Sequence, residues 1–294
     1  MTRSILLSLA AFWCGQLLST PNELCAAEVN VKKGVTYAAY GDRTLQLDLY
    51  LPNTEGESRI AIVLVHGGGW IQGSRDKFSN VAQALAERGY VVANISYRLA
   101  TEAKFPGAVS DVKAATRWLR HHADEYNVDP KRIAGIGGSA GGHLVAMAAL
   151  TPGRFEGDGG LPDVSSEMSA IVVMGSGVDQ VARVRETKGG EVKNCTIFFG
   201  GTLEQVPEIY REASPITHVS AQTPPILFLD GSRDRPGERY VEMRKKLDEL
   251  EITHQLSMVE GAKHGQWGHP DFRPKFVEAM ATFLSKTLLT TSER

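Results

Sequence analysis

The 294-residue sequence lacks several features that would mark a specialised class of protein. Its 32 Lys and Arg nearly balance its 34 Asp and Glu, which gives a formal net charge of −2. A nucleic-acid-binding domain normally needs a basic face, so we expect no nucleic-acid partner. There is no run of like charges and no low-complexity tract, and the absence of an internal repeat excludes a solenoid or propeller. The remaining composition, 42% hydrophobic and 22% charged, is typical of a globular protein. Nothing in it indicates an oligomeric state.

Cysteine is also scarce. Two of the three cysteines, Cys14 and Cys25, lie near the N-terminus and leave Cys195 alone in the rest of the chain. A single cysteine cannot form an internal disulfide, so we expect Cys195 to be a small buried thiol. His264 and His269 lie in a glycine-rich loop at a spacing that zinc sites do not use. We therefore expect neither a metal nor another cofactor.

One long apolar run is present, at residues 5–18. Arg3 precedes it, and the small residues of Cys25-Ala26-Ala27 follow, as in a secretory signal. The run has about 14 residues, fewer than the roughly 20 that a membrane-spanning helix needs, which disfavours an uncleaved anchor. Bulky residues before both N-terminal cysteines disfavour lipid attachment. We expect a signal peptide at 1–27 and an exported, periplasmic or secreted protein at 28–294 with no stable membrane anchor.

Strand and helix patterns alternate from residue 60 onward, after an alternating strand at 45–51. Continuous apolar runs, typical of strands covered on both faces, end in short polar or glycine-rich segments. This order predicts an α/β fold with a mostly parallel central sheet and helices on both faces. The stretch at 151–220 is less regular, and we expect it to be an insertion over the site within one domain. The expected strands are 60–65, 90–95, 133–136, 171–174, 226–229 and 255–259.

Gly137-Gly138-Ser139-Ala140-Gly141 matches the Gly-x-Ser-x-Gly motif between a strand and a helix. The motif places a serine on a turn so sharp that side chains two residues to either side would collide. A competing interpretation is the dinucleotide fingerprint Gly-x-Gly-x-x-Gly/Ala, which fits the segment beginning at Gly135. That fingerprint would need an acid about twenty residues later, where Asp158 stands in a glycine-rich loop. On this motif alone both interpretations stay open.

His-Gly-Gly-Gly-Trp at 66–70 closes the predicted strand 60–65. Loops of this type aim backbone N–H groups at the oxyanion that forms during acyl transfer. We expect Gly68 and Gly69 to be donors, together with the N–H of Ala140. His66 is expected to orient the loop rather than to act as base. A plain glycine-rich turn is the alternative, and the later Gly-x-Ser-x-Gly argues against it.

A catalytic acid and base should follow late strands in the order serine, acid, histidine. Asp230 and Asp234 both follow the strand 226–229. Asp234 is the better acid, because it lies farther past the strand end, and Asp230 is expected to support the turn. His264 follows the strand 255–259 and is the expected base, with His269 as the second candidate. The predicted triad is therefore Ser139, Asp234 and His264.

These motifs together resemble the HGGG-type esterases of the α/β-hydrolase superfamily, which are relatives of hormone-sensitive lipase. Within them the sequence is most similar to the bacterial carboxylesterases that include acetyl-xylan and feruloyl esterases, the BD-FAE-like subgroup. The resemblance covers roughly residues 35–284 and rests on segments 66–70, 96–99, 105–115, 138–144, 213–216 and 261–264. One segment departs from it: the usual His-Gly-x-x-Asp before the acid is Asp-Gly-Ser-Arg-Asp at 230–234.

The resemblance implies a serine hydrolase that cleaves short-acyl esters, acetyl or similar, on a carbohydrate or small molecule through an acyl-enzyme at Ser139. HGGGW loops also occur in kynurenine formamidases and peptidase-like relatives, so a formamide or peptide substrate is an alternative. A catalytically inactive binding protein on the same scaffold is another. The dinucleotide-dependent oxidoreductase is the third.

Overall fold

The computed structural model describes residues 28–53, 58–187 and 190–289, so the predicted signal peptide lies outside the described residues. One eight-stranded sheet runs through this part of the chain in the order β1-β2-β4-β3-β5-β6-β7-β8. The strands are β1 Val29–Tyr40, β2 Arg43–Pro52, β3 Arg59–Val65, β4 Val91–Ile95, β5 Val128–Gly138, β6 Ala170–Met174, β7 Ile226–Gly231 and β8 His254–Val259.

Pairing is parallel from β4 through β3 and β5 to β8, and antiparallel for β1 with β2 and β2 with β4. All seven strands predicted from sequence are present. The edge strand β1 was not predicted; it forms a long hairpin with β2 and is interrupted by register shifts. Its side chains are mostly exposed or half-exposed, so it lacks the apolar run that marks the buried strands.

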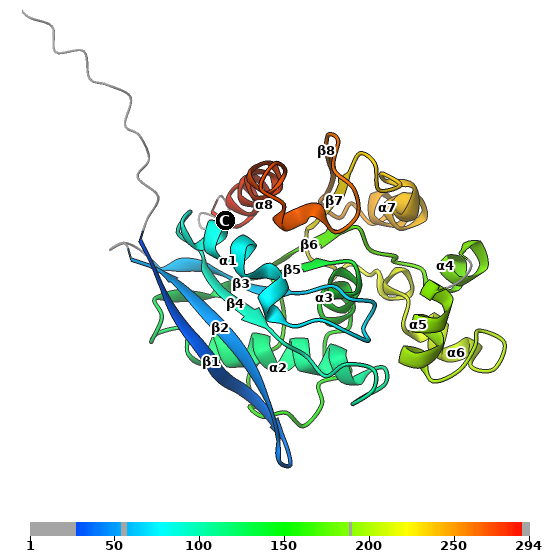
Figure 1. The fold of residues 1–294 in the computed structure, drawn as a ribbon, viewed down its shortest axis with the longest axis horizontal. Coiled ribbons are helices and arrows are strands. Elements are labelled where there is room, and N and C mark those ends of the chain that lie inside the picture. The colour runs from blue at the N-terminus through cyan, green and yellow to red at the C-terminus, as the bar shows by residue number, and fades with distance from the viewer. Residues whose placement is uncertain (1–27, 54–57, 188–189, 290–294) are drawn as a thin grey trace, which may run out of the picture.

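Helices cover both faces of the sheet (Figure 1). In β3, Ile62 and Leu64 pack in the core with α1 and α8, whereas Val63 and Val65 pack in the core with α2 and α3. This alternation follows from the two-residue period of a strand and explains why the whole of β3 is apolar. The helices are α1 Ser79–Ala86, α2 Gly107–His121, α3 Ala140–Leu150, α4 Gln180–Glu186, α5 Gly190–Phe199, α6 Pro207–Glu212, α7 Val241–Glu249 and α8 Arg273–Leu288.

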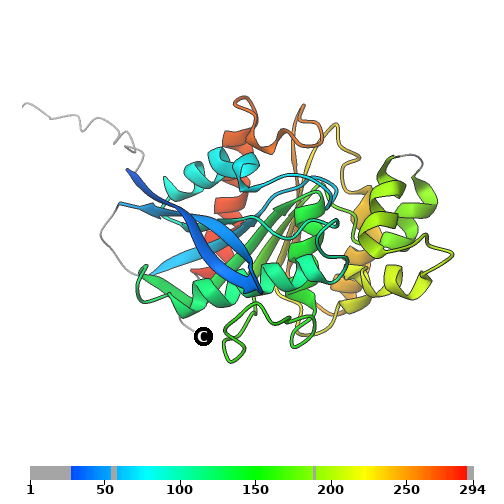
Figure 2. The same ribbon diagram turned by 60° about the horizontal axis from the view of Figure 1, so that its bottom comes forward.

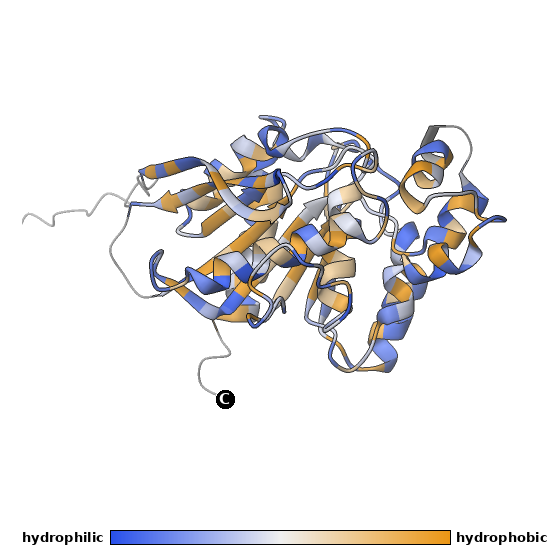
Figure 3. Cartoon of the chain, turned by 90° about the horizontal axis from the view of Figure 1, so that it is seen from below, coloured by the Kyte–Doolittle hydropathy of each residue, from blue (hydrophilic) through white to orange (hydrophobic). Residues whose placement is uncertain are grey.

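The apolar residues concentrate in the middle of the molecule. Figure 3 shows the central strands mostly in the hydrophobic colour, whereas the surrounding helices mix both colours. Among the described residues, no helix is both long enough and apolar enough to span a bilayer.

Helices α4, α5 and α6 form a group at one end of the sheet (Figures 1 and 2). Within 151–220, the residues that lie at the site come from 175–187, Asn194 and Ile216, so the expected insertion is narrower than the sequence indicated. Residues 170–174 form the central strand β6. Residues 151–169 instead lie against α2, where the buried ammonium of Lys113 and the buried guanidinium of Arg117 both bond Glu156, at 2.8 and 2.7 Å. These ion pairs hold that loop away from the site.

Candidate active site

Ser139 occupies the turn between β5 and α3 with φ 52° and ψ −121°, a conformation that L-residues rarely adopt. The flanking glycines explain how the turn is possible. A Cβ on Gly137 would lie 2.3 Å from the Gly141 carbonyl oxygen, and one on Gly141 would lie 2.1 Å from the Val65 carbonyl oxygen. Strand and helix are therefore packed more closely than any side chain at these positions would allow.

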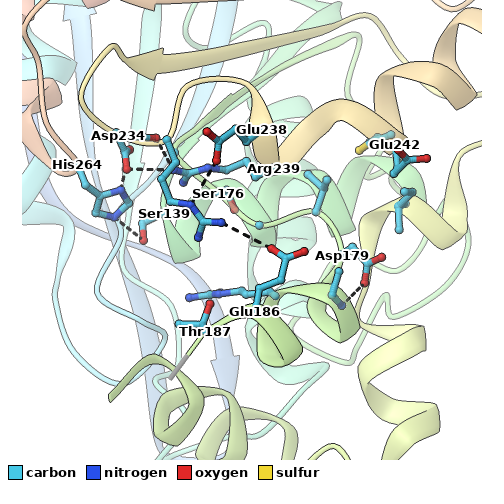
Figure 4. Close-up of a pocket in the computed structure, with 18 residues that line it drawn as sticks. Ser139, Ser176, Asp179, Glu186, Thr187, Asp234, Glu238, Arg239, Glu242 and His264 are labelled. Atoms are coloured by element: carbon cyan, nitrogen blue, oxygen red, sulfur yellow. Dashed lines mark hydrogen bonds and ion pairs between the residues drawn. The ribbon is translucent and has the colours of Figure 1, made fainter. Parts of the chain in front are cut away.

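Ser139, His264 and Asp234 form one hydrogen-bonded chain, although they come from three separate loops (Figure 4). His264 Nε2 lies 3.1 Å from Ser139 Oγ, and His264 Nδ1 lies 2.8 Å from Asp234 Oδ2. With Nδ1–H donating to the carboxylate, Nε2 is left to accept the serine proton. The loops meet because β5, β7 and β8 are parallel and end at the same edge of the sheet.

The two aspartates of the 230–234 turn have different surroundings. Asp230 is fully buried and accepts hydrogen bonds from Gly175 N (2.9 Å), Gly237 N (3.2 Å) and Tyr240 Oη (2.9 Å). Burial raises the pKa of Asp230. Burial also acts to raise the pKa of Asp234, but the bonds and charges of His264 and Arg239 outweigh it and lower that pKa below its usual value. Asp234 is thus the carboxylate held ionised against the histidine.

His269, the second candidate base, lies elsewhere. Its Nδ1 is 3.7 Å from the exposed Asp271 carboxylate, and it lines neither cavity described below. Asp158, the acid that a dinucleotide site would need, lies beside Tyr40 of β1 and also lines neither cavity. Neither residue belongs to the hydrogen-bonded chain that begins at Ser139.

The glycine loop follows β3 and faces Ser139. Gly68 has φ +136° and Gly69 φ +60°, which is the left-handed region that favours glycine. Within the part of the chain that the structure describes, the N–H groups of Gly68 and Gly69 bond no other residue. Ala140 begins α3, so its N–H has no carbonyl of a preceding helical turn to bond. The three expected donors therefore have unused N–H groups around Ser139.

His66 and Trp70 hold the ends of this loop. His66 Nδ1–H donates to the Gly67 carbonyl oxygen (2.8 Å), and its ring stacks on Tyr97 at 4.4 Å between centroids. Trp70 is fully buried and stacks on Phe198 of α5. Burial lowers the pKa of His66 to about 4, so its ring is neutral and suits an orienting role rather than that of a base.

Two cavities meet at Ser139 and His264, with volumes of about 330 and 410 Å³. The smaller lies between α4 and the segment from β7 to α7, and its wall is rich in charged side chains (Figure 4). The larger lies over the glycine loop. Its wall is formed by Gly67, Gly68, Gly69, Gln72, Lys77, Phe78, Asn194, Gly265 and Trp267, besides the two shared residues.

Several residues of these walls were not identified from sequence. Arg239 bonds Asp234, and Arg183 of α4 lies in the smaller cavity, 5.0 Å from the Trp70 ring centroid. Asn194 of α5 lies over the glycine loop, where a Cβ on Gly69 would come within 2.4 Å of its Nδ2. None of them belongs to a local motif. A basic or amide residue in a helix ordinarily indicates only a solvated face, so no signal in the sequence marked them.

No group of three or more His, Cys, Asp or Glu side chains suited to a metal is present in the described ranges. Cys195 is buried, with no disulfide.

Fold and site together define an α/β hydrolase with a serine at its nucleophile turn. The chain belongs to the BD-FAE family, which matches residues 47–247. Esterase LipC from Mycobacterium tuberculosis is 32% identical over 224 residues, which are 71% of this chain and 56% of LipC. The probable carboxylic ester hydrolase LipM of the same organism is 32% identical over 68% of this chain and 47% of its own length. The chain thus spans about half the length of the curated relatives it matches.

Two of the similar solved structures match over nearly their whole length. A truncated carbohydrate esterase from gut microbiota superposes with a TM-score of 0.78 at 25% identity, covering 89% of this chain and 97% of that one. The esterase Est2 of the planctomycete Thermogutta terrifontis, solved with propionate bound, gives a TM-score of 0.71 at 28% identity over 90% and 95% of the two chains. Est2 has also been solved with butyrate bound and phosphorylated by paraoxon.

Proposed function

We propose that this protein is a serine carboxylesterase, with Ser139 as nucleophile, His264 as base and Asp234 as acid. The observation that carries the proposal is the hydrogen-bonded chain from Ser139 Oγ through His264 to Asp234. It lies beside the unused N–H groups of the glycine loop. The esterase relatives support the same reaction.

The geometry suits a two-step acyl transfer. As Ser139 Oγ attacks the ester carbonyl carbon, His264 Nε2 takes the hydroxyl proton, and Asp234 stabilises the imidazolium. The carbonyl oxygen becomes an oxyanion that accepts hydrogen bonds from the N–H groups of Gly68, Gly69 and Ala140. When the C–O bond to the alcohol breaks, Nε2–H protonates the departing oxygen. Water then attacks the acyl-Ser139 carbonyl in the same way and releases the carboxylic acid.

For the substrate we propose a short acyl ester, acetyl or similar, on a carbohydrate or other polar alcohol. Two features of the cavities support this. Among the described residues, the smaller cavity is lined by no Phe, Tyr or Trp side chain, and its wall holds both carboxylates and guanidinium groups, which can bond hydroxyls. A long acyl chain would desolvate these charges without replacing their hydrogen bonds. The propionate and butyrate complexes of Est2 and the gut carbohydrate esterase agree with a short acyl group and a sugar.

A substrate panel tests both parts of the proposal. It comprises acetylated xylan, methyl ferulate, p-nitrophenyl esters of two to twelve carbons, N-formylkynurenine and a dipeptide amide. We expect the highest kcat/KM on acetyl or other short esters. A preference for N-formylkynurenine, or for acyl chains beyond about eight carbons, would reject the proposed substrate class but not the proposed triad.

The nucleophile is tested separately with a fluorophosphonate. We expect one covalent adduct, at Ser139, and no labelling of Ser139→Ala. That variant should retain only the residual catalysis of the oxyanion donors and binding, at least about 10³-fold below wild type. Full activity of Ser139→Ala would reject Ser139 as nucleophile. A wild-type protein that no fluorophosphonate labels would favour an inactive binding protein.

A further inference from the structure

The turn 230–234, which carries the triad acid Asp234, has Asp230 where the usual motif has a histidine. In the structure, an arginine side chain lies beside the triad acid of this turn. Arg239, in the 3₁₀ helix η3 Glu238–Tyr240, points back to Asp234. Its Nη2 donates to the Asp234 backbone carbonyl and, at 3.0 Å, to Asp234 Oδ1. His264 occupies the other oxygen, Oδ2, at 2.8 Å. Each oxygen of the carboxylate therefore has its own cationic or potentially cationic donor.

Asp230 holds the segment from which Arg239 comes. It accepts hydrogen bonds from the N–H of Gly237, which precedes η3, and from the hydroxyl of Tyr240, the last residue of η3. It also lies 4.0 Å from Arg239 Nε. Gly237 has φ +73°, a conformation that lets the chain turn back toward the triad. The Arg239 side chain is only 16% exposed, so its charge is poorly screened by water.

We propose that Arg239 is a positioning residue of the triad, which orients the Asp234 carboxylate toward His264 and places a positive charge beside the pair. The inference rests on the proposed catalytic roles of Ser139, His264 and Asp234. Arg239 orients the carboxylate because its Nη2 bonds both Oδ1 and the backbone carbonyl of Asp234. With Oδ1 fixed in this way, Oδ2 points toward His264. A planar guanidinium group that donates two hydrogen bonds to fixed acceptors holds those acceptors in one geometry, which a lysine ammonium only partly reproduces.

The effect on His264 follows from charge. Asp234 stabilises the imidazolium, and the positive guanidinium beside the same carboxylate opposes part of that stabilisation. Removing the guanidinium charge should therefore stabilise the imidazolium relative to the neutral ring. Since His264 must be neutral to accept the Ser139 proton, the acid limb of kcat/KM should move to higher pH.

Other charged groups near the triad act on His264 from farther away. Those that line the smaller cavity belong to α4 with the residue before it and to the β7–α7 segment. The one that lines the larger cavity belongs to the segment before α1. These groups are Lys77, Asp179, Arg183, Glu186, Arg235, Glu238 and Glu242, with Lys263 adjacent in the chain. Arg235 is the useful comparison: it lies in the same turn but is 60% exposed and pairs with Glu186 and Glu238, at 3.6 and 3.7 Å, rather than with Asp234.

The test measures kcat/KM for p-nitrophenyl acetate against pH for wild type, Arg239→Gln, Arg239→Lys and the matched control Arg235→Gln. For Arg239→Gln we expect the acid midpoint to rise by about 0.5 to 1 unit and kcat at the plateau to fall about tenfold. Arg239→Lys should keep the wild-type midpoint with a partial loss of kcat, because it retains the charge but not the paired geometry. Arg235→Gln should shift the midpoint far less than Arg239→Gln does, because Arg235 is exposed and paired with Glu186 and Glu238.

A second measurement does not depend on turnover. In the Ser139→Ala background, an NMR titration of the His264 ring with and without Arg239→Gln should show the same upward shift of its titration midpoint. An unshifted His264 titration, or equal midpoints for all four proteins, would overturn the proposal and leave Arg239 a purely structural residue. If wild type neither hydrolyses esters nor reacts with a fluorophosphonate, the proposed function fails. The titration still decides whether Arg239 acts on the His264 ring.

Discussion

Asp230 and Asp234 show how surroundings divide the roles of two identical residues. Asp230 is enclosed by three donors from two segments and is fully buried, and its pKa is raised. Asp234 is bonded to His264 and Arg239, and its pKa is lowered. The first arrangement holds loops together, and the second keeps a negative charge against an imidazole.

Amide substitutions should separate these roles. Asp234→Asn removes the charge that stabilises the His264 imidazolium and its preferred tautomer, so we expect kcat to fall by about 10⁴-fold. Asp230→Asn should lower kcat less than about tenfold. Its main effect should be a lower melting temperature, because a buried acceptor is replaced by an amide that cannot satisfy all three donors. Steady-state kinetics and thermal denaturation of both variants provide the measurement. A larger kinetic loss for Asp230→Asn would assign the acid to that residue.

At the scale of elements, the junction between the glycine loop, α3 and the α4–α6 group depends on one buried histidine. His143 of α3 accepts the Trp70 Nε1–H at Nδ1 (3.2 Å) and donates Nε2–H to the Ala213 carbonyl oxygen (2.7 Å). Both ring nitrogens are thus used by a neutral imidazole. The glycine loop and the end of α6 are joined through this ring.

This arrangement predicts a pH dependence of stability. Burial lowers the pKa of His143 from 6.5 to about 4. Below pH 6.5 the unfolded chain binds a proton there and the folded one does not, so the free energy of unfolding should fall as the pH drops toward 4. The loss approaches about 3 kcal/mol at the lower limit. His66, with the same direction of shift, should add to it.

The prediction is measured by urea denaturation at pH 7, 5.5 and 4.5. His143→Gln can accept from Trp70 and donate to Ala213 without titrating, so it should show a shallower decline than wild type. Equal slopes for the two proteins would show that carboxylate groups, not His143, govern acid unfolding.

At the scale of the whole molecule, the catalytic loops lie at one edge of the sheet and the α4–α6 group lies beside them (Figure 2). Residues from this group reach both cavities: Arg183 and Glu186 the smaller, and Asn194 the larger. The parallel sheet supplies the triad, and the helical group supplies much of the wall that a substrate would meet.

A polysaccharide ester as substrate would be met outside the cytoplasm, which agrees with the expected signal peptide at 1–27. When the full chain is expressed in a Gram-negative host, we expect the active protein in the periplasm or medium, with Glu28 at its N-terminus. A variant beginning at residue 28 should stay in the cytoplasm with the same kcat/KM. Cytoplasmic full-length protein that retains Met1 would contradict export.

Sequence alone determined the α/β class, the six strands predicted from apolar runs and the one predicted from alternation, and the residues that meet at Ser139. It could do so because sharp turns and buried strands require particular residues locally: glycines around Ser139, an unbroken apolar β3, a glycine loop after it. The choice of Asp234 over Asp230 and of His264 over His269 also followed from position relative to strand ends. The half-exposed edge strand β1 lacked such a local pattern and was missed.

Tertiary structure alone decided which side chains surround the triad. Arg239 reaches Asp234 because Asp230 and Gly237 turn the intervening chain back, and Asn194 reaches Gly69 because α5 packs on Trp70. Neither contact has a local pattern. Asn194 and Gly69 belong to segments far apart in the sequence, and Arg239, only five residues after Asp234, turns back because Asp230 bonds Gly237 and Tyr240. The path of residues 151–169 was decided in the same way, by ion pairs between Glu156 and two buried cations of α2. Local sequence sets the turns, whereas contacts between distant segments set the charge around the catalytic groups.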